Sequence, residues 1–188
     1  MVESDDEQLW IIHSRKGDHA AFEKLIRTHQ AMIHALTFRL TGSTADAQDL
    51  AQETFVRAYQ QLDSFRGTAK FSSWLYRIAV NTCLDWRRRE KRRAELHVSW
   101  ATNAIVEAEA GARDDLDEAS REVQAALMKL PEKQRAAISL TAYGGKNHAE
   151  AAEILDCSET TISWRIFSAR RKLKKLLSKK YSSGKVSP

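Results

Sequence analysis

The sequence predicts an all-α protein made of two small helical domains joined by a flexible linker. Apolar residues recur at intervals of three and four along most of the chain, which is the spacing of one helix face. The 188 residues include only two prolines and seven glycines, too few for the many turns of an all-β protein. The regular spacing is lost over residues 94–117, which are rich in Ala, Glu and Asp.

Residues 1–93 are expected to form the first domain. Its first helix spans residues 19–41, ends at Gly42 and Ser43, and carries an apolar stripe from Phe22 to Leu40. A second helix follows Thr44, whose side chain can cap it, and runs to about Leu62. Its expected inner face consists of Ala47, Leu50, Ala51, Phe55, Ala58 and Leu62.

A polar loop at residues 63–68, DSFRGT, separates that helix from a third. The third helix is predicted from about Phe71 to Arg93, and its last stretch, residues 85–93, holds six basic and two acidic residues. Cations at a helix C-terminus also interact favourably with the helix dipole. The basic run therefore fits either nucleic-acid binding or helix stabilisation.

Residues 118–177 are expected to form the second domain. A helix starts near Glu118 and ends at Leu130, because a residue before proline disfavours the α conformation. A second helix runs from Glu132 to about Tyr143. A shorter helix follows, with Asn147 and Glu150 spaced as a capping box.

Ser158 caps the last helix, which is long and basic. A short helix, a tight turn and a longer basic helix form the pattern of a helix-turn-helix. Residues 178–188 are expected to form a basic disordered tail. Because the acidic linker has few large apolar residues, the two domains are expected to move independently.

The charge is unevenly distributed. Lys and Arg outnumber Asp and Glu by 15 to 12 in residues 1–93 and by 14 to 7 in residues 118–188, whereas residues 94–117 have one base and six acids. This distribution suggests polyanion contacts at both ends. Cys83 and Cys157 lack CxxC partners, and no signal peptide or apolar run of membrane-spanning length is present, so a cytoplasmic protein without membrane insertion is expected.

Catalytic and metal-site patterns are missing from the sequence. It contains no GxxxxGK[ST] or GxGxxG loop, no GxSxG elbow and no HExxH pair, so no enzymatic activity, cofactor or metal is expected. Asp46, Asp49 and Glu53 form a carboxylate stripe at helical spacing, but no histidines accompany it at the spacing of a di-metal site. The stripe fits either a solvated face or a docking face for a basic partner.

Aromatic and basic residues alternate between positions 65 and 89. Aromatic rings among cations can stack unpaired bases while the cations follow the phosphates. Trp74 and Ile78 are assigned to the core by their spacing, whereas the loop over residues 64–70 and the solvent side of Tyr76 to Arg89 are assigned to nucleic acid.

Three motifs, in this order, resemble extracytoplasmic-function (ECF, group 4) sigma factors of the sigma-70 family. DAQDLAQETFVRAY resembles their polymerase-docking helix, and FRGTAKFSSWLYRIAVNT resembles the segment that melts and reads the −10 element. LPEKQRAAISL followed by EAAEILDCSETTISWRIFSARRKL resembles the domain that reads the −35 element. The resemblance covers about residues 10–93 and 118–177.

The resemblance implies three sites and several partners. Core RNA polymerase would bind through its β′ clamp coiled coil and its β flap, promoter DNA would be read at two elements, and an anti-sigma factor would control the protein. The implied polymerase-binding residues are Asp46, Asp49, Leu50, Gln52 and Glu53. The implied −10 residues are Ser64, Phe65, Arg66, Gly67, Lys70, Arg77, Asn81, Arg87, Arg88 and Arg89. The implied −35 residues are Thr160, Thr161, Ser163, Trp164, Arg165, Phe167, Ser168 and Arg171.

The last helix departs from the family pattern, which often has arginines at the positions of Ser163 and Ser168 and a small residue at Trp164. Two alternative functions fit the sequence less well. A stand-alone two-domain helix-turn-helix regulator acting without polymerase has no need for the acidic stripe, and a structural adaptor protein does not explain the basic helix ends.

Overall fold

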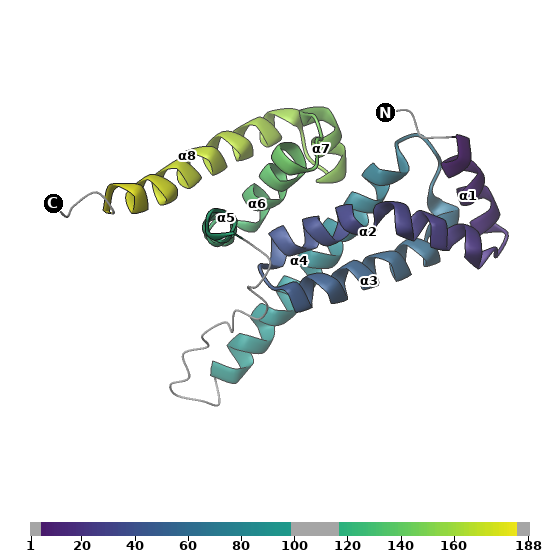
Figure 1. Cartoon of the computed structure of the whole chain (residues 1–188), viewed down its shortest axis with the longest axis horizontal. Coiled ribbons are helices and arrows are strands. Elements are labelled where there is room, and N and C mark those ends of the chain that lie inside the picture. Colours follow the sequence, from purple (N-terminus) through teal and green to yellow (C-terminus); the bar gives the residue numbers. More distant parts are fainter. Residues whose placement is uncertain (1–4, 99–116, 184–188) are drawn as a thin grey trace.

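The computed structural model describes residues 5–98 and 117–183, and every regular element in these two ranges is helical (Figure 1). The prediction of an all-α fold is therefore confirmed. The elements are α1 (Asp5–Arg15), α2 (His19–Thr41), α3 (Thr44–Gln60), η1 (Leu62–Ser64), α4 (Phe71–Val98), α5 (Glu118–Met128), α6 (Glu132–Ile138), η2 (Ser139–Tyr143), α7 (His148–Ile154) and α8 (Glu159–Ser183).

Helices α1 to α4 form the first half of the molecule. Gly42 ends α2 in the left-handed conformation (φ 81°), and its N–H donates to the carbonyl of Phe38. The cap of α3 is Ser43, whose hydroxyl accepts from the N–H of Asp46 at 3.3 Å. The expected cap, Thr44, is instead the first residue of the helix, one position further along.

Helix α1 was not predicted from the sequence. Its buried side includes Glu7, whose carboxylate lies 2.5 Å from His29 Nε2, while Leu9 and Ile12 are exposed. A carboxylate and an imidazole in contact on the inner side, and apolar residues on the outer side, hide the helical period of this segment. The buried side chain of Ile11 adds apolar packing beside this contact.

Two helices extend past their expected ends. Helix α4 continues to Val98, so the expected domain boundary after Arg93 falls inside a helix. Helix α8 continues to Ser183, so the first residues of the expected disordered tail are helical. The rest of the expected linker, residues 99–116, and the rest of the tail, residues 184–188, lie outside the described residues.

Local sequence signals position the helix-turn-helix correctly. Asn147 and Glu150 form the predicted capping box at the start of α7. The turn passes through Asp156 in the left-handed conformation (φ 47°), and the hydroxyl of Ser158 accepts from the N–H of Thr161 at 3.2 Å. The inward side of α8 is the predicted one, with Ile162, Ile166 and Ala169 buried.

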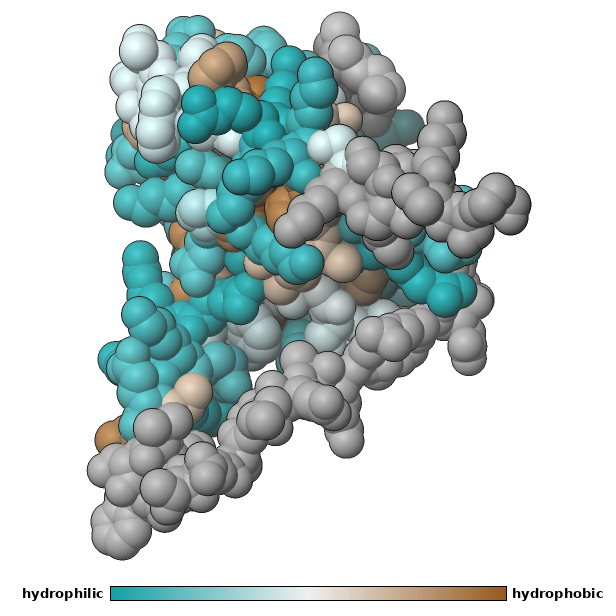
Figure 2. Space-filling view, turned by 90° about the vertical axis from the view of Figure 1, so that its left-hand side faces the viewer, coloured by the Kyte–Doolittle hydropathy of each residue, from teal (hydrophilic) through white to brown (hydrophobic). Residues whose placement is uncertain are grey.

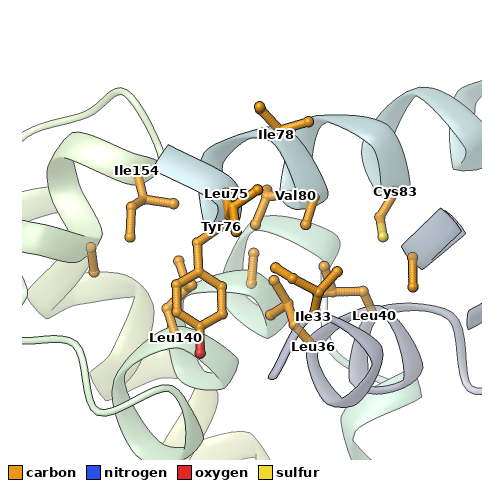
Figure 3. Close-up of a cluster of buried hydrophobic side chains, with 14 of the residues drawn as sticks. Ile33, Leu36, Leu40, Leu75, Tyr76, Ile78, Val80, Cys83, Leu140 and Ile154 are labelled. Carbon is orange, nitrogen blue, oxygen red and sulfur yellow. The ribbon is translucent and has the colours of Figure 1, made fainter. Parts of the chain in front are cut away.

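The two halves of the chain pack against each other, contrary to the expectation that they move independently. Helix α2 contacts α5, α6 and η2, and α4 contacts α7. Figure 3 shows Leu140 and Ile154 of the second half beside Leu36, Leu75 and other residues of the first, within one buried cluster. Apolar burial of this extent is favourable in water, so the halves form one body in this state.

Polar contacts also cross the interface. The ammonium of Lys146 donates to Ser73 Oγ at 2.9 Å and lies 5.4 Å from the ring centre of Tyr76. Gln124 Nε2 donates to the Phe38 carbonyl at 2.9 Å. These contacts leave Tyr76 only 4% exposed, so its expected solvent-facing role with nucleic acid is wrong for this arrangement.

Arg135 is a buried charge at this interface. It is 2% exposed, its Nη1 donates to Met128 Sδ at 2.9 Å, and its Nε has no hydrogen-bond partner. Burial lowers the pKa of Arg135 to about 10, and the neighbouring guanidinium of Arg87 adds to this shift. The carboxylate of Glu132 offsets this shift only in part, and a buried cation that is incompletely paired opposes the packing around it.

The close approach of the halves also involves Gly42. A Cβ atom at this position would lie 2.9 Å from Met128 Sδ, so the Met128 side chain would have to shift.

The face of the molecule seen in Figure 2 is mostly hydrophilic, with apolar residues in small patches. No helix in residues 5–98 or 117–183 has both the length and the apolar content needed to cross a bilayer.

Cys83 provides a chemical test of this buried core. It is 2% exposed, and burial raises the pKa of its thiol to about 12, whereas Cys157 is half-buried. Because only the thiolate reacts, we expect iodoacetamide to modify Cys83 at least about tenfold more slowly than Cys157 in the free protein. Mass spectrometry of timed samples measures both rates, and unfolding in guanidinium should make them similar. Equal rates in the folded protein would contradict the buried position of Cys83.

Candidate nucleic-acid interface

The predicted acidic stripe lies on the outer side of α3. Asp49 and Gln52 are exposed, and Asp46 and Glu53 are half-exposed. Leu50, which the resemblance implied as a polymerase contact, is 3% exposed and belongs to the core, as its predicted place on the inner face of the helix requires. It follows Asp49 by one position, about 100° further around the helix axis, which turns it from the solvent side toward the core.

The basic end of α4 runs alongside this stripe. Glu53 Oε1 is 2.5 Å from Arg57 Nη2 and 3.8 Å from Arg89 Nη2. A cavity of about 180 Å³ lies between the two helices and is lined by Asp46, Asp49, Leu50, Glu53, Trp86, Arg89, Glu90 and Arg93. Arg89 was expected to hold the DNA backbone, but here it pairs with the acidic stripe.

The loop between η1 and α4 presents its polar residues outward. Ser64, Arg66 and Lys70 are exposed, and Gly67 has a positive φ of 71° that favours glycine. Phe65 was expected to contact DNA, but it is 6% exposed. Its ring packs against Phe71 and Trp74, with ring centres 5.4 and 5.3 Å away. The packing of Phe65 in the core thus anchors the loop to the start of α4.

Asn81 lines a cavity between the end of α3 and the middle of α4. The cavity, of about 400 Å³, is lined by Arg57, Gln61, Ile78, Asn81, Leu84, Asp85 and Arg88. Asn81 is exposed, and Arg88 Nη1 is 3.1 Å from Asp85 Oδ1. Two side-chain amides and two guanidinium groups offer both donors and acceptors, which can match the edge of a base.

The second half of the chain engages two of the cations expected at DNA. Arg77 is exposed and lies 3.9 Å from the fully exposed Asp156, in the turn of the helix-turn-helix. Arg87 Nε lies 4.0 Å from Glu132 Oε1, and this buried nitrogen has no hydrogen-bond partner. Neither cation is as free for a phosphate as the sequence suggested.

The outer side of α8 agrees with the predicted helical phase. Thr160, Ser163 and Arg171 are exposed, as are Trp164 (62%) and Phe167 (65%), while Thr161, Arg165 and Ser168 are partly covered. Arg165 Nη1 donates to Cys157 Sγ at 3.3 Å, close to the turn. This side of α8 therefore combines hydroxyls, two aromatic rings and flanking arginines.

Sequence reasoning missed His148, at the start of α7. Its Nδ1 lies 3.0 Å from Ser163 Oγ, so it joins the exposed side of α8. The signal was available, because the first turn of the first helix lies beside the second helix in a helix-turn-helix. Within the described ranges, no group of three or more His, Cys, Asp or Glu side chains is placed to hold a metal ion.

Comparison with known protein families identifies both halves. The sigma-70 region 2 model matches residues 25–93, and the sigma-70 region 4 model matches residues 120–173. The chain is 32% identical to the RNA polymerase sigma-H factor of Pseudomonas aeruginosa, over 94% of this chain and 96% of that protein. It is 35% identical to the ECF RNA polymerase sigma-E factor of Escherichia coli K12, over 90% of this chain and 93% of that protein.

Two solved structures are similar over both halves. The sigma factor RpoE of Bartonella quintana, in complex with the anti-sigma factor NepR, has a TM-score of 0.68 at 28% identity, covering 84% of this chain and 96% of that one. CnrH, in complex with the cytosolic domain of CnrY, has a TM-score of 0.66 at 31% identity, covering 93% of this chain and 98% of that one. The chain therefore belongs to the sigma-70 family, and it is an RNA polymerase sigma factor of the ECF type.

Proposed function

We propose that this chain is a group 4 sigma factor that binds core RNA polymerase and directs it to promoters by recognising −10 and −35 elements. It binds and orients its partners and has no catalytic site of its own. The observation that carries the proposal is the presence of an acidic docking face on α3 and a polar reading face on α8 in one chain. A regulator acting without polymerase would need only the second.

The acidic stripe on α3 is proposed to dock on the basic β′ clamp coiled coil, and the second half is proposed to dock on the β flap. Asp49 and Gln52 are exposed, so they can contact polymerase without any rearrangement of neighbouring side chains. Glu53 is already paired with Arg57 and Arg89. Docking through Glu53 therefore requires these two arginines to be displaced.

The −10 element is proposed to be read by the η1–α4 loop together with Asn81. Ser64, Arg66 and Lys70 are exposed around the loop, and the cavity beside Asn81 offers amide donors and acceptors. An enzyme or binding protein that extracts a base from the duplex loses a few kcal/mol of stacking and pairing. Specific hydrogen bonds in such a pocket can offset that loss.

Promoter binding requires the two halves to separate. The element names imply centres about 25 base pairs apart, which is roughly 85 Å along B-form DNA at about 3.4 Å per base pair. Lys146 bonded to Ser73, and Leu140 packed among first-half residues, cannot coexist with that span. The packed arrangement is therefore proposed as the form that is not bound to a promoter.

An anti-sigma factor is proposed to control this protein. Both similar structures described above are complexes with a second protein: RpoE with the anti-sigma factor NepR, and CnrH with the cytosolic domain of CnrY. Their likeness to this chain extends over both halves, which are packed together here. A regulator that favours the packed form would prevent promoter binding by population shift.

The proposed function is tested by reconstitution. The purified chain is mixed with core polymerase, and the complex is used to select promoters from a random DNA pool and then to transcribe them. Stable association and transcription from selected sequences with two separated elements are expected. DNA binding by the chain alone, unaffected by core polymerase, would instead support the stand-alone regulator.

The −35 preference should be altered by arginines at two positions of α8. Ser163 is exposed and Ser168 is partly covered at its edge. Arginine is the common bidentate reader of guanine, with about 1–3 kcal/mol of discrimination for each good pair. Selection with the Ser163→Arg, Ser168→Arg double variant should therefore yield more guanine-containing elements.

The matched control for that selection is Arg171→Ala. Because Arg171 is expected to contact the backbone, its loss should weaken binding to all sequences about equally and flatten the salt dependence. If the double arginine variant keeps the parental −35 sequence, the two serines do not face the bases.

A further inference from the structure

Arg15, the last residue of α1, reaches the loop that is proposed to read the −10 element. Its Nε donates to the carbonyl of Leu62 at 3.3 Å, and its Nη2 donates to the carbonyl of Phe65. These partners are 47 and 50 residues away in the sequence. Arg15 also lies outside residues 25–93, the part that matches the region 2 family model.

The two carbonyls differ in what they already bind. Leu62 begins η1, and its carbonyl already accepts from the N–H of Phe65 at 3.2 Å, so Arg15 adds a second donor there, whereas Phe65 follows the helix. A guanidinium has several N–H donors in a fixed plane, so one arginine can bind both carbonyls.

The guanidinium is held by a well-anchored helix. Ile11 is buried, Ser14 Oγ donates to the Trp10 carbonyl at 2.6 Å, and Glu7 lies 2.5 Å from His29. The last of these contacts joins α1 to α2 in the interior of the first half. Arg15 therefore fixes the position of the loop relative to helices α1 and α2.

The anchored carbonyls flank the residues that point outward. Phe65 lies in the core against Phe71 and Trp74, whereas Ser64 and Arg66, on either side of it, are exposed. Gly67, which follows, has a positive φ and no atom within 4 Å of an added Cβ. Hydrogen bonds that hold the backbone at Leu62 and Phe65 therefore also fix the positions from which the side chains of Ser64 and Arg66 extend.

We propose that Arg15 is a positioning residue for −10 recognition, which acts by holding the backbone of the reading loop through two carbonyls. This role rests on the proposed function of the loop. A positioning role differs from a general stabilising role in its consequence. Loss of Arg15 should affect the choice of base at the −10 element more than the affinity for polymerase or for the −35 element.

The test uses holoenzyme assembled from the full chain and core polymerase. The probe is a promoter selected with the wild-type holoenzyme and left unpaired across the −10 element, alongside probes with single base changes there. We expect Arg15→Ala to reduce the ratio of affinities for selected and changed bases by about tenfold, as for the loss of one charge-assisted hydrogen bond. Arg15→Lys, which keeps the charge but lacks the planar fork, should give a smaller reduction.

Lys16→Ala is the matched control, because it removes the same charge from the neighbouring exposed residue. It should leave the ratio unchanged, and all three variants should keep the wild-type affinity for core polymerase. If Arg15→Ala weakens all probes equally, or changes the ratio no more than Lys16→Ala does, the positioning role is overturned. If Arg15→Ala does not fold, an unchanged ratio for Arg15→Lys overturns it as well.

Failure of the underlying function gives a different result. Arg66→Ala, on the loop itself, should change the −10 preference if this loop reads the element. If wild-type and Arg66→Ala holoenzymes select the same −10 bases, the loop does not read DNA. The proposed −10 site then fails, and the role of Arg15 fails with it.

Discussion

Reversing two charges on α3 should abolish binding to core RNA polymerase. In the variant Asp49→Lys, Glu53→Lys, two carboxylates of the docking face become cations, while the neighbouring core residues Leu50 and Phe55 are untouched. Placing like charges opposite each other at an interface costs several kcal/mol. We therefore expect the affinity for core polymerase, measured by titration with a fluorescent chain, to fall at least about a hundredfold.

The control for this variant is Asp6→Lys, Glu23→Lys, which changes the net charge equally at exposed positions of α1 and α2. It should bind core polymerase as the wild type does at physiological salt. Circular dichroism should show unchanged helicity in both variants. If the α3 variant and its control bind core polymerase with equal affinity, the docking face does not lie on α3.

Replacing Arg135 by methionine should stabilise the packed arrangement of the two halves. The arginine is buried with an unbonded Nε, and the nearby Arg87 adds repulsion. Replacing buried charges with apolar side chains of similar volume is often stabilising by about 1–4 kcal/mol. We therefore expect a higher melting temperature and slower hydrogen exchange in residues 75–80 of α4.

The same variant should transcribe less well, because promoter binding must then overcome a more stable packed form. About a tenfold lower rate from a selected promoter is expected at limiting sigma factor, since each 1.4 kcal/mol is a factor of ten. Lys133→Met is the control, because it removes a charge from an exposed position of the same helix. Faster exchange or higher activity in Arg135→Met would mean that the arginine supports the packing.

Local signals in the sequence were sufficient for most helix ends. Gly42 and the Asn147–Glu150 capping box act through neighbouring backbone groups, so their effects can be read from a few residues. Helix α1 was missed because a carboxylate, Glu7, faces inward to bind His29, 22 residues away. No local pattern reveals such a pairing.

The site was predictable by region but not by side chain. The family motif includes Leu50 and Phe65 together with their exposed neighbours. The helical spacing already placed Leu50 on the inner face, whereas Phe65 lies in a loop without a regular period, and only the packing shows that it faces the core. The docking of the two halves depends on contacts such as Lys146 with Ser73, which are 73 residues apart. Such contacts depend on the surfaces that the two folded halves present to each other, and the spacing of apolar residues in the sequence does not reveal them.

Gly42 is subject to two constraints of different scale. The end of α2 requires a residue that adopts φ 81°, and a Cβ atom there would displace the flexible side chain of Met128. Asparagine, which tolerates the left-handed conformation in many turns, satisfies the first constraint and meets the second once the Met128 side chain shifts. The amino-acid choice at this turn is therefore coupled to the side-chain position of a residue in the second half of the protein.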